Sequence, residues 1–242
     1  IAQAAEKILS EVNAINYKSL AFQGKLSGRL KISVVSTGKY VMPYFLSEFM
    51  RENDGLELVM DVTNKLRVIK TLEDNETDFA LVSVLPEKLK IKRIELMDNK
   101  LFFVSSKSLD FGKSKLNKKT FESQPLIYRE HGSATRNAMQ DFIKEKKYSN
   151  IKKIELTSNE AVKQAVVSGL GSSIMPLIGL KNELMNNDVQ IVQVKGLPIK
   201  TSWNLVWLES KKLSPAAEAF KEYIKVEKER IINEKFHWIF SY

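Results

Sequence analysis

The sequence predicts an α/β fold with two similar halves that are joined by two crossing segments. Short apolar stretches such as 30–35 and 78–82 alternate with stretches of helical period, and apolar strands of this kind form parallel sheets that are covered on both faces. The alternation begins again from 126 onward, which indicates a second half. The segments near 96–103 and 195–205 are the expected crossings.

The first 22 residues show the most regular helical pattern of the chain. Apolar residues from Ile1 to Phe22 recur in alternating steps of four and three, interrupted only at Ser19, which is a heptad seam. The strict spacing favours burial against a partner helix over packing on the rest of the chain. We expect a linker and dimerisation helix at 1–24, and the start inside a helix without methionine indicates a fragment.

Strands and helices of the first half follow in order. A helix is expected from Tyr40 to Arg51, where Pro43 fits the first turn, and another after the cap formed by Thr63 and Asn64. The predicted strands of this half are 30–35, 56–62 and 78–82.

The second half repeats the pattern. Thr157 to Glu160 matches a capping box before a helix, Ser214-Pro215 starts the last helix, and the Lys-rich loop 107–119 is expected on the surface. The aromatic tail 236–242 is expected to fold onto the chain, with an oligomer contact as the alternative. The predicted strands are 94–104, 126–128, 151–156, 171–176, 189–194 and 201–208. The predicted units are a linker helix at 1–24, subdomain I at 29–99 and 205–242, and subdomain II at 100–204.

Composition excludes several classes of site. The 242 residues contain no cysteine and two histidines, so we expect no metal site, no cofactor and no cysteine nucleophile. No apolar run of about 20 residues or secretory signal is present, which indicates a cytoplasmic protein without a membrane partner. The net charge of +9 comes from lysines along the whole sequence, which favours a solvated surface over a nucleic-acid site.

The segment 124–136 is the leading candidate for a binding site. It reads as a strand, a polar turn and a helix start, with Ser133 as the N-cap. The positive end of a helix dipole and unpaired N–H groups favour an anion there. The alternative is that Ser133 only caps the helix while His131 and Arg136 are solvated.

Other polar loops also follow predicted strands. Ligands of such sheets bind beyond the carboxyl ends of the strands, so we expect these loops to converge on one cleft between the halves. The candidate effector-binding residues are Ser36, Thr37, Thr63, Ser83, His131, Gly132, Ser133, Thr135, Arg136 and Ser158.

Five motifs, in order and spacing, resemble the linker helix and effector-binding domain of LysR-type transcriptional regulators, most closely the branch that regulates carbon-fixation genes. They are Gly28–Ser33; Asp78–Val82; Pro125–Ile127 with Gly132–Arg136; Ser158–Val166 with Gly169–Gly171; and Leu197–Ile199 through Leu213–Ala217.

The resemblance implies a type II periplasmic-binding-protein-like fold, with two Rossmann-like subdomains around an effector cleft. It also implies homodimers or homotetramers, and contact with DNA only through an N-terminal domain upstream of Ile1. His131 stands where proline or asparagine is more usual in the family, and Ser172-Ser173 stand where apolar residues are frequent. Both departures indicate that the chemistry of this pocket differs from that of better-known members of the family.

The leading hypothesis is therefore a domain that senses a small, anionic metabolite and contributes to transcription regulation. One alternative is the solute-binding protein of a transporter, but the sequence shows no export signal that would support it. A second is a dehydratase-type enzyme on the same fold. Catalysis needs a positioned acid or base, and Glu130, His131 and Ser133 form no evident triad. We expect no enzyme activity.

Overall fold

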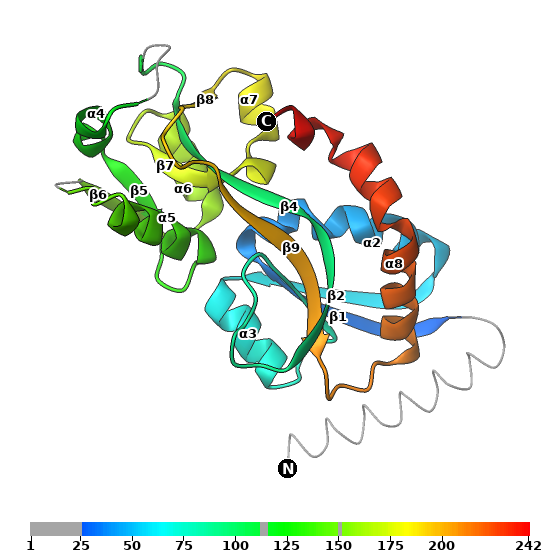
Figure 1. Ribbon diagram of the computed structural model, residues 1–242. Helices are drawn as coiled ribbons and strands as arrows, with labels where there is room; N and C mark the ends of the chain where they lie inside the picture. Colours follow the sequence, from blue (N-terminus) through cyan, green and yellow to red (C-terminus); the bar gives the residue numbers. More distant parts are fainter. Residues whose placement is uncertain (1–25, 112–115, 150–151) are drawn as a thin grey trace.

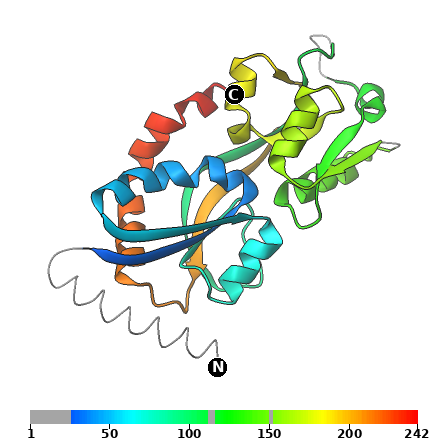
Figure 2. The ribbon, with the colours of Figure 1, turned by 180° about the vertical axis from the view of Figure 1, so that it is seen from behind.

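The computed structural model describes residues 26–111, 116–149 and 152–242 (Figures 1 and 2). The linker helix that the sequence predicts at 1–24 lies outside these residues. Within the described ranges, no helix combines the length and the apolar character needed to cross a membrane.

The first half is built on three parallel strands in the order β2-β1-β3. Strand β3 is apolar and buried along its whole length, as expected of a covered parallel sheet, β1 is mostly buried, and the edge strand β2 is partly exposed. Helices α2 and α8 pack against each other, and α3 contacts β1 and β3. The elements are β1 (Ser27–Val35), α2 (Met42–Glu52), β2 (Gly55–Thr63), α3 (Lys65–Glu73), β3 (Phe79–Val82) and α8 (Pro215–Lys235).

Two long strands cross between the halves, as predicted. Strands β4 (Ile91–Ser106) and β9 (Ile199–Leu208) pair antiparallel, from Ile91 opposite Leu208 to Leu101 opposite Ile199. Figure 1 shows them running side by side from one half to the other. Strand β4 starts earlier than the predicted 94, because β9 continues to pair with it there.

The second half extends from the other end of β4. Strands β7 and β8 pair antiparallel with β4, and β5 pairs parallel with β6. The Ile127 amide donates to the Ser172 carbonyl at 2.8 Å, which places β5 beside the start of β7. The elements are α4 (Lys118–Ser123), β5 (Leu126–Arg129), α5 (Ala134–Glu145), β6 (Lys153–Leu156), α6 (Asn159–Val167), β7 (Ser173–Pro176), η2 (Leu177–Gly179), α7 (Lys181–Met185) and β8 (Val189–Ile191).

Three local predictions were wrong. The expected turn after β1 is a 3-10 helix, η1 (Ser36–Tyr40), and α4 begins inside the expected surface loop, where Asn117 caps it. The capping box was expected to begin at Thr157, which is one residue too early. Ser158 is the N-cap of α6 and accepts a hydrogen bond from the Ala161 amide at 3.0 Å. Glu160 does not reach back to the cap, because its carboxylate binds side chains elsewhere.

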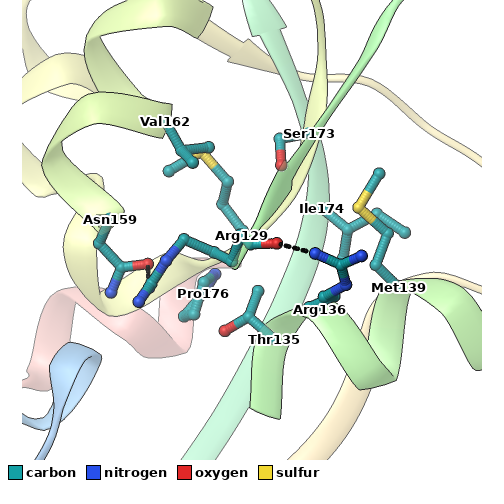
Figure 3. A pocket seen from close by; sticks show the side chains of 10 residues that line it. Arg129, Thr135, Arg136, Met139, Asn159, Val162, Ser173, Ile174 and Pro176 are labelled. Atoms are coloured by element: carbon teal, nitrogen blue, oxygen red, sulfur yellow. Dashed lines mark hydrogen bonds between the residues drawn. The ribbon is translucent and has the colours of Figure 1, made fainter. Parts of the chain in front are cut away.

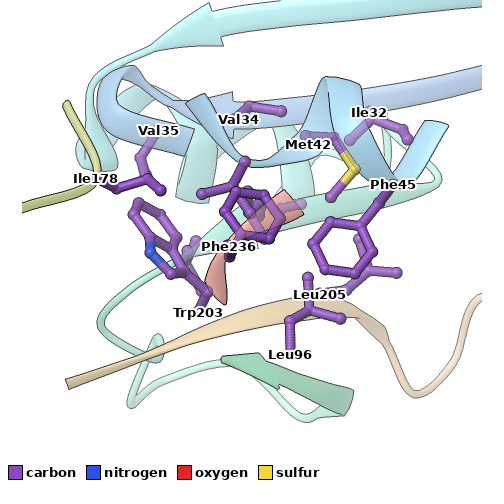
Figure 4. Close-up of a cluster of buried hydrophobic side chains, with 14 of the residues drawn as sticks. Ile32, Val34, Val35, Met42, Phe45, Leu96, Ile178, Trp203, Leu205 and Phe236 are labelled. Carbon is purple, nitrogen blue, oxygen red and sulfur yellow. The ribbon is translucent and has the colours of Figure 1, made fainter. Parts of the chain in front are cut away.

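The main hydrophobic core lies between β1, α2 and α8 and continues along the crossing strands. Figure 4 shows Phe236 between Phe45 and Trp203, and the rings of Phe45 and Phe236 stack with centroids 5.9 Å apart. The aromatic tail therefore folds onto the chain, as predicted, and ends in η3 (His237–Ser241). Since this core includes residues of both halves, the subdomain boundaries at 99/100 and 204/205 remain a prediction.

Candidate functional site

A pocket lies at the carboxyl end of β5, between β7 and the N-terminal parts of α5 and α6 (Figure 3). It measures about 230 Å³ when the open solvent at its mouth is included, and its side chains nearly fill it. Half of the lining residues are polar and half are apolar. The lining residues are Arg129, Thr135, Arg136, Asn159 and Ser173, with Met139, Val162, Ile174, Met175 and Pro176.

Arg129, the last residue of β5, is the central charge of the pocket. Its side chain is only 4% exposed. Nε and Nη2 donate to the two carboxylate oxygens of Glu130 at 2.8 and 2.9 Å. Nη2 also donates to Ser36 Oγ at 3.0 Å, and Nη1 donates to Asn159 Oδ1. Arg129 therefore connects the second half to the first half.

Asn159, the first residue of α6, is 5% exposed. Its Oδ1 accepts from Arg129, which fixes the orientation of the amide, because a guanidinium can only donate. Its Nδ2 is buried and has no hydrogen-bond partner among the described residues. A buried donor without a partner costs about 1–3 kcal/mol. The pocket therefore lacks one hydrogen-bond acceptor.

Arg136 lies on the first turn of α5 and is 19% exposed. Its Nη1 donates to the Arg129 carbonyl at 2.9 Å and to Glu155 Oε2 at 2.6 Å. Figure 3 shows Arg129, Thr135 and Arg136 around the same space. Both arginines thus have a carboxylate partner, and Thr135 adds a hydroxyl between them.

A second set of contacts joins the halves beside the pocket. Tyr40 Oη donates a hydrogen bond to Glu160, and Lys39 forms an ion pair with the same carboxylate at 3.2 Å. On the second half, Lys163 pairs with both Glu160 at 3.1 Å and Glu183 at 2.8 Å. Burial raises the pKa of Tyr40 well above 10, and the hydrogen bond to Glu160 raises it further.

The loop before α5 packs closely on the first half. Gly132 has a φ of +89°, a conformation that glycine adopts without strain. A Cβ at this position would lie 2.8 Å from Leu66 Cδ1 on α3. The positive φ therefore favours glycine at this position, while the exposed Leu66 side chain could move away from a Cβ.

The structure brings together several of the residues that the sequence selected. Ser36 Oγ donates to the Thr63 carbonyl at 3.2 Å, so these two loops meet at Arg129. Thr135 and Arg136 line the pocket, and Ser158 precedes Asn159. Their role in effector binding remains a prediction.

The remaining selected residues lie outside the pocket lining. His131 is exposed, Thr37 is buried and Ser83 is half-buried. Ser133 occupies the N-cap position of α5, as predicted, although its side chain makes no capping hydrogen bond. The turn orders this residue instead, since the Ser133 amide donates to the Glu130 carbonyl at 3.3 Å.

Sequence reasoning missed Arg129 and Asn159 as pocket residues, whereas Ser173, which it noted as a departure from the family pattern, does line the pocket. The predicted strand ended at Tyr128, and Arg129 was not singled out within the segment 124–136, although it directly follows the apolar run Leu126–Tyr128. Asn159 was read only as part of a cap. Among the described residues, no group of three or more His, Cys, Asp or Glu side chains is arranged to hold a metal ion.

Comparisons with known sequences agree with this architecture. The profile of the family described as "LysR substrate binding domain" matches residues 23–228. The transcriptional activator CmpR of Synechocystis sp. is 31% identical over 225 residues, which are 93% of this chain and 74% of that protein. The RuBisCO operon transcriptional regulator of Allochromatium vinosum is 34% identical over 212 residues, which are 87% of this chain and 70% of that protein.

Solved structures are similar as well. The CcmR regulatory domain of Synechocystis PCC6803 in complex with 2-PG is 32% identical with a TM-score of 0.76, and the match covers 82% of this chain and 96% of that one. The effector-binding domain of QuiR in complex with shikimate has a TM-score of 0.72 at 18% identity, covering 84% and 98% of the two chains. The QuiR match supports the fold alone.

Proposed function

Because the chain belongs to the LysR family of transcriptional regulators and forms the effector-binding domain of such a regulator, we propose that it senses a small metabolite that carries an anionic group. The predicted family and fold are thereby confirmed. The matched relatives are transcriptional regulators, not enzymes, in agreement with the expected absence of enzyme activity.

The observation that carries this proposal is the unpartnered Nδ2 of Asn159 beside the buried guanidinium of Arg129. Nδ2 of Asn159 is a hydrogen-bond donor without a partner among the described residues, and a carboxylate or phosphate oxygen is an acceptor only. An anionic group next to Asn159 would complete the hydrogen bonding of the pocket. The 2-PG complex of the CcmR domain, at 32% identity, supports a small effector of this kind.

In this proposal the effector acts by shifting a population of conformations. The Arg129–Ser36 and Tyr40–Glu160 contacts hold the halves together beside a nearly filled pocket, whose lining residues all belong to the second half. An effector must separate the lining side chains, and it changes the equilibrium only by its differential affinity for the two arrangements. The change in angle between the halves would reach DNA through the linker helix at 1–24 and an N-terminal domain.

The regulator would work in the cytoplasm as a homodimer or homotetramer that assembles through the linker helix at 1–24. One of its relatives is a RuBisCO operon transcriptional regulator. This similarity supports carbon-fixation genes as the targets.

Titration calorimetry tests the proposal with 2-PG, shikimate and other small carboxylates and phosphate esters. Asn159→Asp retains the acceptor that binds Arg129 but replaces the unpartnered donor by a second acceptor. We expect saturable binding of at least one of these anions to the wild type, with at least about tenfold weaker binding by the variant, because a charge-assisted hydrogen bond contributes about 1.5–3 kcal/mol.

Asn182→Asp is the matched control, since Asn182 is exposed on α7. It introduces the same charge away from the pocket, and it should bind as the wild type does. Equal affinity of the wild type and Asn159→Asp, or failure of every anion to bind, would contradict the proposal.

A further inference from the structure

Glu130 occupies Arg129 in the way that an anionic ligand would. Its two carboxylate oxygens accept from Nε and Nη2 at 2.8 and 2.9 Å, which is the bidentate geometry of arginine with carboxylates and phosphates. The Glu130 side chain is 18% exposed and that of Arg129 is 4% exposed. The pair therefore sits in a largely buried environment, where an unpaired charge is costly.

The pairing decides which donors remain for a ligand. A guanidinium has five N–H groups. Nε donates to Glu130, Nη2 donates to Glu130 and Ser36, and Nη1 donates to Asn159. One N–H of Nη1 is left, together with Nδ2 of Asn159. A ligand thus meets hydrogen-bond donors but no net positive charge.

This arrangement works against simple inorganic anions. Arginine binds phosphate and similar anions through this same bidentate contact, and the carboxylate next to Arg129 in sequence competes for that contact at a high effective concentration. A metabolite can instead add apolar contacts with the Met139 and Val162 side of the pocket. An inorganic ion cannot make such apolar contacts.

We propose that Glu130 is a specificity-determining residue of the effector pocket, which excludes inorganic anions from Arg129 so that a metabolite with additional contacts is selected. This inference rests on the proposed function, because it takes the pocket to be the effector site. It adds a residue that opposes the binding of the wrong ligands.

Glu155 provides a comparison within the same pocket. It pairs with Arg136 through one oxygen at 2.6 Å, and its side chain is 53% exposed. Water screens this pair much more than the buried one. Removal of the Glu155 charge therefore changes the net charge beside the pocket without freeing the buried guanidinium.

The test measures the binding of inorganic phosphate to Glu130→Gln, Glu155→Gln and the wild type, by calorimetry at constant ionic strength. Glutamine still accepts one hydrogen bond from Arg129, and circular dichroism without phosphate checks that the fold persists. We expect a phosphate Kd at least about tenfold lower in Glu130→Gln than in the wild type, and a clearly smaller change in Glu155→Gln.

An unchanged phosphate Kd in Glu130→Gln, or an equal gain in Glu155→Gln, would overturn the inference. If Glu130→Gln does not fold, Glu130→Asp replaces it, because the shorter side chain keeps the charge but cannot span both nitrogens. Its phosphate Kd should then lie below that of the wild type, and an unchanged value would equally overturn the inference. The metabolite titrations with Asn159→Asp test the proposed function separately, so the two failures are distinguishable.

Discussion

The hydroxyl of Tyr40 on the first half donates a hydrogen bond to the carboxylate of Glu160 on the second half. Residues 120 positions apart in the sequence are thereby joined beside the pocket. Burial disfavours the charged form of Glu160, but the hydrogen bonds from Tyr40, Lys163 and Lys39 outweigh it and lower its pKa from 4.5 to about 2.

A pH-dependent stability difference follows from this lowered pKa. A carboxyl group with a lower pKa in the folded chain stabilises the fold above its unfolded-state pKa, and the contribution is lost as the pH falls through the folded-state value. We expect Glu160→Gln to be less stable than the wild type near pH 7, by less than about 1 kcal/mol since the group is half-exposed. The difference should shrink below about pH 5. Urea denaturation at several pH values measures it, and a pH-independent difference would contradict the assignment.

Arg136→Ala should weaken effector binding without unfolding the chain. Arg136 lines the pocket and its Nη1 donates to the Arg129 carbonyl at 2.9 Å. Loss of a charge-assisted contact with an anionic effector costs about 1.5–3 kcal/mol, or tenfold or more in Kd. Calorimetry measures the affinity and circular dichroism the fold. Unchanged affinity would remove Arg136 from the site.

Gly132→Ala should destabilise the fold. An alanine at φ +89° is strained by about 1–3 kcal/mol, and its Cβ would also meet Leu66. Urea denaturation should show a lower free energy of unfolding. The double variant with Leu66→Ala relieves the contact but not the backbone strain, so it should recover only part of the loss. Full recovery would show that the side-chain contact alone requires glycine.

Phe236→Ala should be one of the most destabilising substitutions in the C-terminal segment. Phe236 is 2% exposed, stacks on Phe45 and meets the Tyr44 ring edge-on at 5.3 Å. Truncation of a buried phenylalanine costs about 3–5 kcal/mol. Phe240, which is 59% exposed, is the control, and its truncation should cost less than about 0.5 kcal/mol. Similar losses in the two variants would contradict this packing.

Periodicity predicted the order of strands and helices because it reports directly on burial. The run that became β3 is apolar along its whole length, β1 ends in a buried stretch, and the crossing strands were visible as long segments with apolar stretches. Short elements such as α4 and η1 were missed, since five or six residues carry too little periodicity.

The site was predicted less well than the fold. The structure brings the predicted residues Ser36 and Thr63 together at Arg129 and places Arg136 in the pocket lining, and their role in effector binding stays a prediction. Arg129 and Asn159 could not be singled out, because their importance comes from burial and from a hydrogen bond between residues 30 positions apart. That information lies in the tertiary structure rather than in any local pattern.

A crystal structure of the domain with its bound anionic effector tests the central claim most directly. The proposed function predicts an acceptor oxygen of the effector about 3 Å from Asn159 Nδ2, with the Arg129 guanidinium beside it. An effector bound elsewhere in the domain, with Nδ2 of Asn159 still lacking an acceptor, would contradict it.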